Sequence, residues 1–332
     1  MRLAIFNLTA DDELLLTESG MEEMKGLGRR WRDRLMKLVN EMVVDNKTFG
    51  FTDTQRTIES ARLFKEGLLN KTNVDLPPPI DNTDLLHFYK NCKKYNEAIF
   101  QKRKTEVEVK KLFRSYTLPS LKRLVENVNK RLGYRIKTVS FKAVELMWDM
   151  CRWEMSWYKS NWAWCAIFTR EEMKLFEDNE DLFFYLQDGY AYNITREMTG
   201  VLLNDLLSKL KDNREDTSVG NSRFYFAHSE TFLPFLTRLG IARDDPPLSV
   251  DNLPDERKWR TSLIGGESSN LAVVGMRCRE RKKIKLYLNE RVVNVDGCKD
   301  NICDVGEFIS KYEKFAFSTL RDVCRTLNTT NM

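Results

Sequence analysis

Two stretches, KTFGFTDTQRTIESARLFKEGL (47–68) and RFYFAHSETFLPFLTRLG (223–240), decide the fold because they share one pattern. Each opens with residues typical of a strand, turns through a polar segment, and continues with apolar residues at helical spacing. The first helix is predicted from Asp53 to about Leu69, and the second ends at Gly240. Strand–turn–helix units of this kind are typical of an α/β domain.

The two turns carry side chains that suit a phosphate group. The first turn holds Arg56, and the second holds His228 and Glu230. Ligands of open α/β sheets bind beyond the carboxyl ends of strands, where helix N-termini present free N–H groups. An arginine can bind phosphate with two parallel hydrogen bonds, a histidine adds a donor, and a glutamate can protonate a leaving oxygen. The three residues together predict a phosphate site.

Each of these residues taken alone has a more ordinary interpretation. An arginine at a helix start is more often a surface or ion-pair residue, and a single histidine after a strand is more often structural. The other histidine of the chain, His87, lies in a helical pattern, LLHFYK, where a packing role is expected. The prediction therefore depends on Arg56, His228 and Glu230 coming together.

The remaining segments extend the α/β pattern. LPPPI (76–80) breaks the chain and marks a candidate domain boundary. The sequence predicts an α/β domain of residues 1–75 and 190–332, and a basic, all-helical insert of residues 76–189. Further helices are expected over 19–43, 83–132, 138–190 and 305–327, and a strand pair over 270–278 and 284–295.

Composition excludes several classes of protein. The 332 residues include 42% hydrophobic residues, with 19 Phe, 11 Tyr and 7 Trp, which excludes an intrinsically disordered chain. No apolar run approaches the roughly 20 residues that a transmembrane helix needs. The pair Cys298 and Cys303 has no second ligand pair for zinc, so we expect neither a metal nor a cofactor.

Positive charge is concentrated in one segment. The net charge is +5, but residues 90–142 contain 16 Lys or Arg and 4 Glu, so this segment carries +12 and the rest −7. Such a segment attracts a polyanion, which could be a phosphorylated small molecule, a nucleic acid or a membrane surface. The alternative is a solvated helical face. Because no nucleic-acid-binding motif is visible, we expect no nucleic-acid partner.

The cysteines and glycosylation motifs leave the compartment open. The seven Cys leave at least one thiol unpaired if the others form disulfides. All seven could equally be reduced thiols of a cytosolic protein. The first residues, MRLAIFNLTADDELLL, contain no signal peptide, whereas N-x-S/T motifs point to secretion. The five candidate glycosylation sites are Asn7, Asn46, Asn70, Asn193 and Asn328.

At these residues the chain resembles the multiple inositol polyphosphate phosphatases, a branch of the histidine acid phosphatases. The resemblance covers nearly the whole chain, in the family's order. It implies a phosphoglycerate-mutase-like fold, with a central mixed sheet flanked by helices and an inserted helical domain. The segments that carry it are LTESGMEEMKGLGRR (16–30), FTDTQRTIESARLFKEGL (51–68), PPIDNTDLLHFYKNC (78–92), DGYAYNITREMTGVLL (188–203), FAHSETFLPFLTRLGI (226–241), KWRTSLI (258–264), NLAVV (270–274), LNERVV (288–293) and GCKDNIC (297–303).

The resemblance implies hydrolysis of phosphomonoesters through a phosphohistidine, with inositol polyphosphates and also bisphosphoglycerate as candidate substrates. Arg56 then holds the phosphoryl group, His228 donates to it, and Glu230 is the proton donor. The family motif at this point is usually His-Ala-Glu, and this chain has Ser229 in the middle.

One family motif does not occur in the sequence. The nucleophile of the family lies in an Arg-His-Gly-x-Arg-x-Pro motif before the first helix, and the 332 residues contain no Arg-His-Gly. Two interpretations follow: an incomplete version of an active phosphatase, or a short form that binds inositol phosphates or other polyanions without catalysis. Loss of an inner strand would leave strand edges unpaired, which favours the first interpretation.

The resemblance also implies a location and a disulfide. It places the protein in the secretory pathway, in the endoplasmic reticulum lumen, outside the cell or at its surface. The N-x-S/T motifs then become glycosylation sites. Cys298 and Cys303 resemble a disulfide near the C-terminus of the family.

Overall fold

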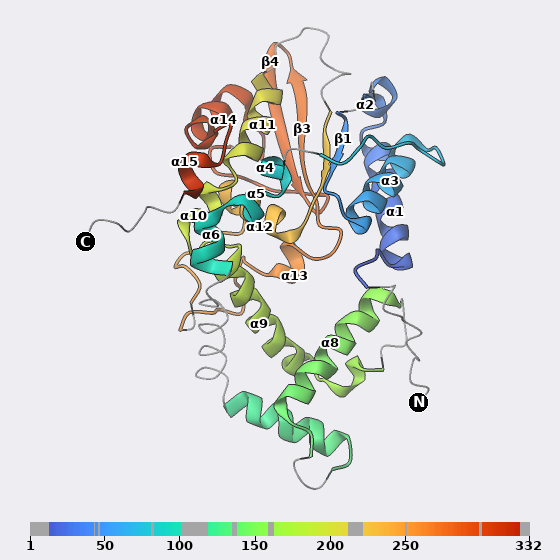
Figure 1. Ribbon diagram of the computed structural model, residues 1–332, viewed down its shortest axis with the longest axis vertical. Coiled ribbons are helices and arrows are strands. Elements are labelled where there is room, and N and C mark those ends of the chain that lie inside the picture. The colour runs from blue at the N-terminus through green and yellow to red at the C-terminus, as the bar shows by residue number, and fades with distance from the viewer. Residues whose placement is uncertain are drawn as a thin grey trace, which may run out of the picture.

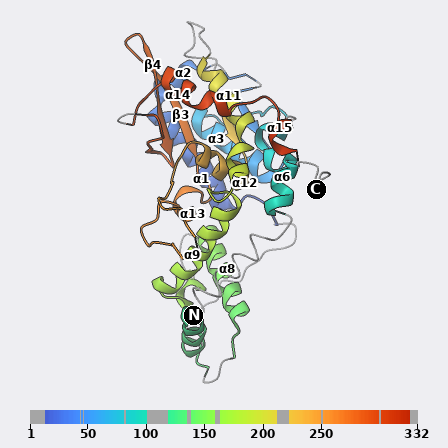
Figure 2. The same cartoon turned by 90° about the vertical axis from the view of Figure 1, so that its left-hand side faces the viewer.

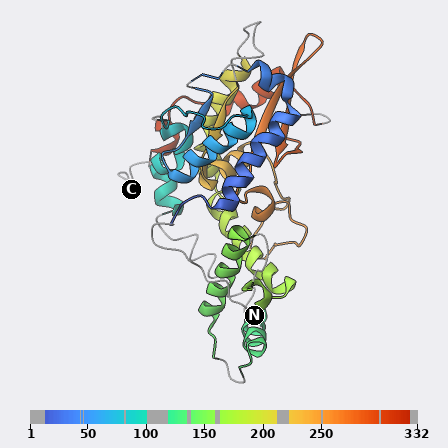
Figure 3. The ribbon, with the colours of Figure 1, turned by 90° about the vertical axis from the view of Figure 1, so that its right-hand side faces the viewer.

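The protein has an α/β lobe and an elongated helical extension (Figure 1). The structure, a computed structural model, describes residues 13–325 apart from 43, 46, 81–82, 101–118, 135–137, 159–162, 212–221, 250 and 299–300. Figures 2 and 3 show that the extension continues along the long axis of the molecule, away from the strands. None of the described helices is long and apolar enough to cross a membrane.

Helices make up most of the described structure. Besides them there is a π-helical turn, η2 (Asn96–Phe100), and residues 119–131 are helical. The 3-10 turns are η3 (Cys165–Ile167) and η4 (Glu313–Phe315). The α-helices are α1 (Glu18–Arg34), α2 (Met36–Glu41), α3 (Gln55–Leu69), α4 (Thr83–Leu86), α5 (Phe88–Asn91), α6 (Lys93–Tyr95), α8 (Phe141–Trp157), α9 (Arg170–Gln187), α10 (Asn193–Glu197), α11 (Gly200–Lys211), α12 (Ser229–Arg238), α13 (Thr261–Ile264), α14 (Val305–Tyr312) and α15 (Arg321–Cys324).

The described strands form two sheets. β1 (Phe49–Phe51) and β2 (Phe224–Phe226) pair in parallel, with Gly50 opposite Tyr225. β3 (Leu271–Cys278) and β4 (Arg281–Leu288) form an antiparallel hairpin. β5 (Arg291–Val292) and β6 (Cys303–Asp304) both pair with β4. Within the described residues β2 therefore has a strand partner on one edge only, and so does β3.

Close packing of α1 on α3 supports the parallel pair. A Cβ atom on Gly28 would collide with the carbonyl oxygen of Phe64, and one on Gly67 would collide with that of Lys25. The two glycines therefore let the helix backbones approach. The aromatic ring of Phe64 lies 5.4 Å from that of Phe224, so α3 covers the strand pair.

Four apolar clusters fill the interior. The first, around Trp259, joins α9, α11, α12, α14 and the strand β4. The second joins α5, α6, α10 and α15, and the fourth joins α1, α3 and β1. The third lies in the helical extension, around Val144 and Phe176. The buried Arg257, with its Nη2 atom 2.7 Å from Asp178 Oδ1, ties α9 to the C-terminal part of the chain.

Six of the seven cysteines form disulfides: Cys92–Cys324, Cys151–Cys165 and Cys298–Cys303. The resemblance anticipated the last of these, which is confirmed. Composition alone is equally consistent with reduced thiols and with disulfides, and the structure contains three disulfides. Cys278, exposed near the tip of the β3–β4 hairpin, is the remaining thiol.

The predicted fold class is confirmed, with differences in detail. The predicted helix over 19–43 is interrupted at Leu35, where φ is −120° and ψ is 33°, and continues as α2. Residues 83–100 were predicted as part of the insert, but Phe88 and Tyr95 share an apolar core with Met198 of the α/β lobe. The boundaries of the insert, 76–189, and of the α/β domain, 1–75 and 190–332, remain predictions.

The Cys92–Cys324 disulfide joins residues 232 positions apart, whereas Cys298–Cys303 joins residues 5 apart. Because a cross-link stabilises mainly by restricting the unfolded chain, the longer loop gains more. We expect C92A/C324A to lower the free energy of unfolding by about 4–5 kcal/mol, and C298A/C303A by about 2 kcal/mol. Equal losses in urea unfolding would contradict this explanation.

Candidate phosphate-binding site

The parallel pairing of β1 with β2 brings the two predicted turns to one sheet edge. Both strands end there, at Phe51 and Phe226, which lie opposite each other. Arg56 is the second residue of α3. His228 is the N-cap residue of α12, and Glu230 is the second residue of that helix. The site residues therefore stand at the first turns of two adjacent helices.

Arg56 and His228 are in direct contact. The Nη2 atom of Arg56 lies 3.2 Å from Nδ1 of His228, and Nε2 of His228 lies 3.0 Å from Oγ1 of Thr52. A guanidinium group can only donate hydrogen bonds, so Nδ1 is the acceptor. The proton of the imidazole is then on Nε2 and is donated to Thr52.

Two further threonines hold Thr52 in place. The hydroxyl of Thr57 donates to the carbonyl oxygen of Thr52 at 2.7 Å, and its oxygen lies 2.9 Å from Thr52 Oγ1. Thr54 Oγ1 lies 2.8 Å from the same Thr57 oxygen. Since Thr57 and Thr52 are buried, this network fixes the turn between β1 and α3 and, through it, the ring of His228.

His87 also lies in the site, against the expectation of a packing role. Its ring stacks on that of His228, with centroids 5.4 Å apart and an angle of 13° between the planes. The Thr231 hydroxyl of α12 donates to the carbonyl oxygen of Leu86 at 2.5 Å, which fastens this segment to the site. The Nε2 atom of His87 is buried and has no hydrogen-bond partner among the described residues.

Glu230 is close enough to change the electrostatics of its surroundings. Its charge raises the pKa of His228, Tyr89 and the buried Asp188. Burial has the larger effect in each case: it lowers the pKa of His228 and raises the pKa of the other two groups. Its Oε2 atom accepts a hydrogen bond of 3.0 Å from the hydroxyl of Ser229. The serine at the middle position of the His-Ser-Glu segment thus contacts the glutamate directly.

The surroundings of His228 keep its imidazole uncharged. Burial is the largest cause of the change and the positive charge of Arg56 is the second, and together they lower the pKa of His228 to about 4. Burial, with the charge of Lys90 as a second cause, also lowers the pKa of His87. The two stacked imidazoles are therefore neutral at pH 7, next to an arginine that is always charged.

A family model for the histidine phosphatase superfamily, branch 2, matches residues 4–289 of the chain. The chain belongs to this superfamily. The match includes both strand–turn–helix units and therefore Arg56, His228 and Glu230. The sequence-based recognition of a histidine phosphatase is confirmed.

Relatives within the superfamily include Multiple inositol polyphosphate phosphatase 1 of Drosophila melanogaster, which is 30% identical over 96% of this chain and 68% of its own length. The Homo sapiens protein of the same name is 24% identical over 84% of this chain and 61% of its own length. The histidine phosphatase chain thus spans about two thirds of the curated relatives that it matches.

Solved structures share the fold. A phytase from D. castellii superposes with a TM-score of 0.75 at 18% identity, over 93% of this chain and 67% of its own. A Bifidobacterium longum multiple inositol polyphosphate phosphatase superposes with a TM-score of 0.65 at 16% identity, over 95% and 81%. These likenesses support the α/β fold with a helical part.

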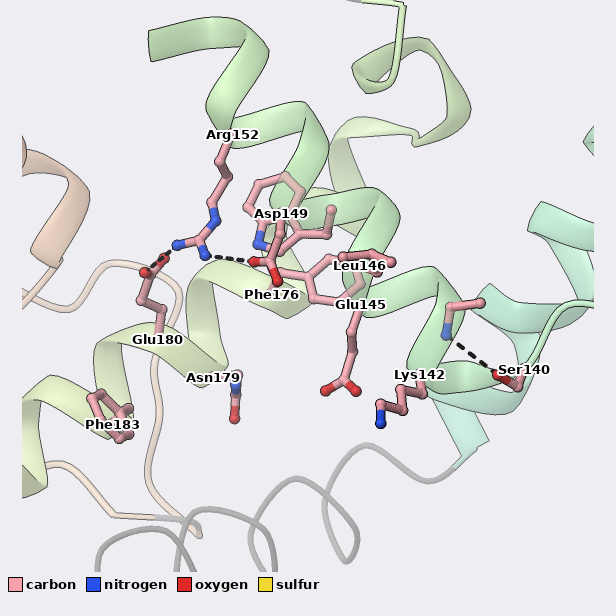
Figure 4. Close-up of a pocket in the computed structure, with 12 residues that line it drawn as sticks. Ser140, Lys142, Glu145, Leu146, Asp149, Arg152, Phe176, Asn179, Glu180 and Phe183 are labelled. Carbon is pink, nitrogen blue, oxygen red and sulfur yellow. Dashed lines mark hydrogen bonds and ion pairs between the residues drawn. The ribbon is translucent and has the colours of Figure 1, made fainter. Parts of the chain in front are cut away.

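A separate groove of about 730 Å³ lies between α8 and α9 of the histidine phosphatase chain (Figure 4). It does not offer a free arginine to phosphate, because Arg152 is paired with Asp149 at 2.6 Å and with Glu180 at 2.5 Å. Trp148 and Phe176 stack along its wall. No described group of three or more His, Cys, Asp or Glu side chains could hold a metal ion.

Two of the five candidate glycosylation sites are described. Asn70 is exposed in the left-handed conformation at the end of α3, and Asn193 is exposed at the start of α10. Asn7, Asn46 and Asn328 lie outside the described residues.

Asp188 is a buried carboxyl whose hydroxyl partner is Tyr95, at 2.9 Å. Burial, offset partly by the Tyr95 hydrogen bond, raises the pKa of Asp188 from 3.8 to about 7. Between these values the folded state holds a proton that the unfolded chain has released, so this group makes the protein less stable as pH rises.

We expect Asp188→Asn to remove this pH dependence, because the amide does not titrate, while its oxygen still accepts the Tyr95 hydrogen bond. As pH rises from about 4 to about 7, the free energy of unfolding of the variant should increase relative to that of the wild type by up to about 1.4 kcal/mol per pH unit. Urea unfolding at several pH values measures this difference. A difference that stays constant with pH would contradict the burial of an ionisable carboxyl.

Proposed function

We propose that the chain binds phosphomonoesters at Arg56, His228 and Glu230, and that it belongs to an enzyme that removes phosphate from inositol polyphosphates. The observation that carries this proposal is the meeting of the three side chains at one sheet edge, with Arg56 Nη2 at 3.2 Å from His228 Nδ1. Membership of the histidine phosphatase superfamily and the names of the relatives support the same substrate class.

Arg56 would bind the phosphoryl oxygens with its fork of N–H groups. The N-terminus of α12, a helix of 10 residues, would add backbone N–H groups and a partial positive charge. A phosphate dianion near His228 favours the imidazolium and therefore raises the pKa of that histidine. Once protonated on both nitrogens, His228 donates to the phosphate, and binding takes up a proton.

Hydrolysis would proceed in two steps. A histidine nitrogen attacks phosphorus, the bond to the ester oxygen breaks, and Glu230 gives a proton to the departing alkoxide. Water then attacks the phosphohistidine, loses a proton to Glu230, and releases inorganic phosphate. We infer that the nucleophile comes from an Arg-His-Gly loop beyond the 332 residues, which contain no such motif. The unpaired edges of β2 and β3 among the described strands support this inference.

The alternative is a short form that binds inositol phosphates or other polyanions without hydrolysing them. It is favoured by one observation: neither His87 nor His228 stands in an Arg-His-Gly context. The two functions share the binding site and differ only in the presence of a nucleophile.

A substrate with several phosphates suits the charge around the site. Lys90 is exposed one helical turn after His87, and its charge lowers the pKa of both histidines. It opens the +12 segment of residues 90–142. Inositol polyphosphates offer phosphate groups to Lys90 as well as to Arg56, and bisphosphoglycerate is a smaller candidate of the same chemistry.

We further propose that the protein passes through the secretory pathway and is glycosylated. Three disulfides support an oxidising compartment. Asn70 and Asn193 are exposed in N-x-T motifs, as an oligosaccharide acceptor must be.

The test of binding is calorimetry with inositol hexakisphosphate. We expect Arg56→Ala to weaken binding by about 10- to 100-fold, because it removes a charge-assisted, two-point contact worth roughly 1.5–3 kcal/mol. Lys71→Ala is the matched control, since it removes one exposed positive charge beyond the other end of α3. An equal loss of affinity in the two variants would contradict a specific site and would indicate general electrostatic attraction.

Hydrolysis is tested on the protein purified from its natural source, by N-terminal peptide mass spectrometry and phosphate release. An upstream Arg-His-Gly peptide together with turnover supports the enzyme, and Glu230→Gln in that protein should then slow turnover far more than it weakens binding. Unchanged turnover in the variant would contradict the proton-donor role. An N-terminus at Met1 with binding but no phosphate release supports the alternative.

A further inference from the structure

The β3–β4 hairpin ends in a basic tip that the phosphate site does not use. Residues 277–285, RCRERKKIK, contain six Lys or Arg and one Glu, a net charge of +5. The side chains of Leu271 and Val273, at the other end of β3, pack on the core around Trp259. In Figures 2 and 3 the hairpin runs past its neighbours to a projecting tip.

Three arginines of the tip are not accounted for by folding. Arg277, Arg279 and Arg281 are exposed, and none forms an ion pair with another described residue. In contrast, the next cations of β4 contact the protein. The Nζ atom of Lys283 lies 3.2 Å from Asp304, and that of Lys285 lies 6.0 Å from the ring centroid of Tyr287.

The tip also breaks local rules of hairpin stability. Arg277 stands directly opposite Lys282 in the antiparallel register, and like charges in that position destabilise a strand pair. Arg279 occupies the turn with φ of 58°, a conformation that favours Gly or Asn. Solubility alone requires neither the facing like charges nor an arginine in the left-handed turn position. The arginines therefore point to a ligand whose binding offsets this loss of stability.

We propose that this tip binds a sulfated polysaccharide. Sulfate groups accept the paired hydrogen bonds that arginine offers, and a linear polyanion can contact cations on both faces and at the turn. A bilayer is a poorer partner, because Met276 is the only large apolar side chain over residues 276–282, and membrane-bound segments bury several. The three disulfides also fit a protein that meets polysaccharides outside the cytosol.

The test uses the full chain on immobilised heparin with a salt gradient, followed by affinity measurement with a heparin oligosaccharide. We expect R277Q/R279N/R281Q to elute at lower salt and to bind about tenfold or more weakly. The matched control is K37Q/K71Q/R170Q, which removes three exposed cations that lie outside both the hairpin and the basic segment of residues 90–142. This control should elute close to the wild type.

Two further measurements separate the possible outcomes. The hairpin variant should unfold at an unchanged or higher temperature, since it removes like-charge repulsion and places Asn at the strained turn position. It should bind inositol hexakisphosphate as the wild type does, and Arg56→Ala should keep full heparin affinity, so this inference fails independently of the proposed function.

Wild-type elution of the hairpin variant would overturn the inference, and so would an equal loss in the control variant. Sedimentation with phosphatidylserine vesicles that depends on the three arginines, without heparin retention that depends on them, would also overturn it and would assign the tip to a lipid surface.

Discussion

The parallel pairing of β1 with β2 is the constraint on which the rest of the structure depends. Each strand has three residues, and they come from distant parts of the chain. Because the strands are parallel, the turn that follows each one lies at the same edge. Arg56 and His228 can meet only for this reason. The helices α3 and α12 then begin next to each other, with their N-termini at one point.

Holding this arrangement together has an energetic cost. Arg56 and His228 would repel each other if the imidazole were charged, so the folded state keeps His228 neutral, with a pKa of about 4. Asp188, which is buried within reach of the charge of Glu230, keeps its proton up to about pH 7, because burial raises its pKa to about 7. Groups of this kind are expensive to bury and are typical of functional sites. Thr52 and Thr57 supply the hydrogen bonds that hold His228 in one orientation.

Much of this was predictable from the sequence, because it depends on local patterns. The spacing of apolar residues predicts the two strand–turn–helix units. Their turns contain Arg56, His228 and Glu230. His87 was not predictable, since its stacking on His228 depends on how a segment before α5 packs against α12. The same holds for Cys92 and Cys324, whose pairing depends on an apolar core between distant helices.

The central claim, a phosphate site built around Arg56 and a neutral His228, is tested most directly by NMR of the imidazole groups. The chain has two histidines, so the spectrum contains two imidazole Hε1 signals, which His87→Gln assigns. Titration with inorganic phosphate should shift both signals and raise the pKa of His228 from about 4, and Arg56→Ala should abolish the response. Signals that do not move with phosphate in the wild-type protein would contradict the site.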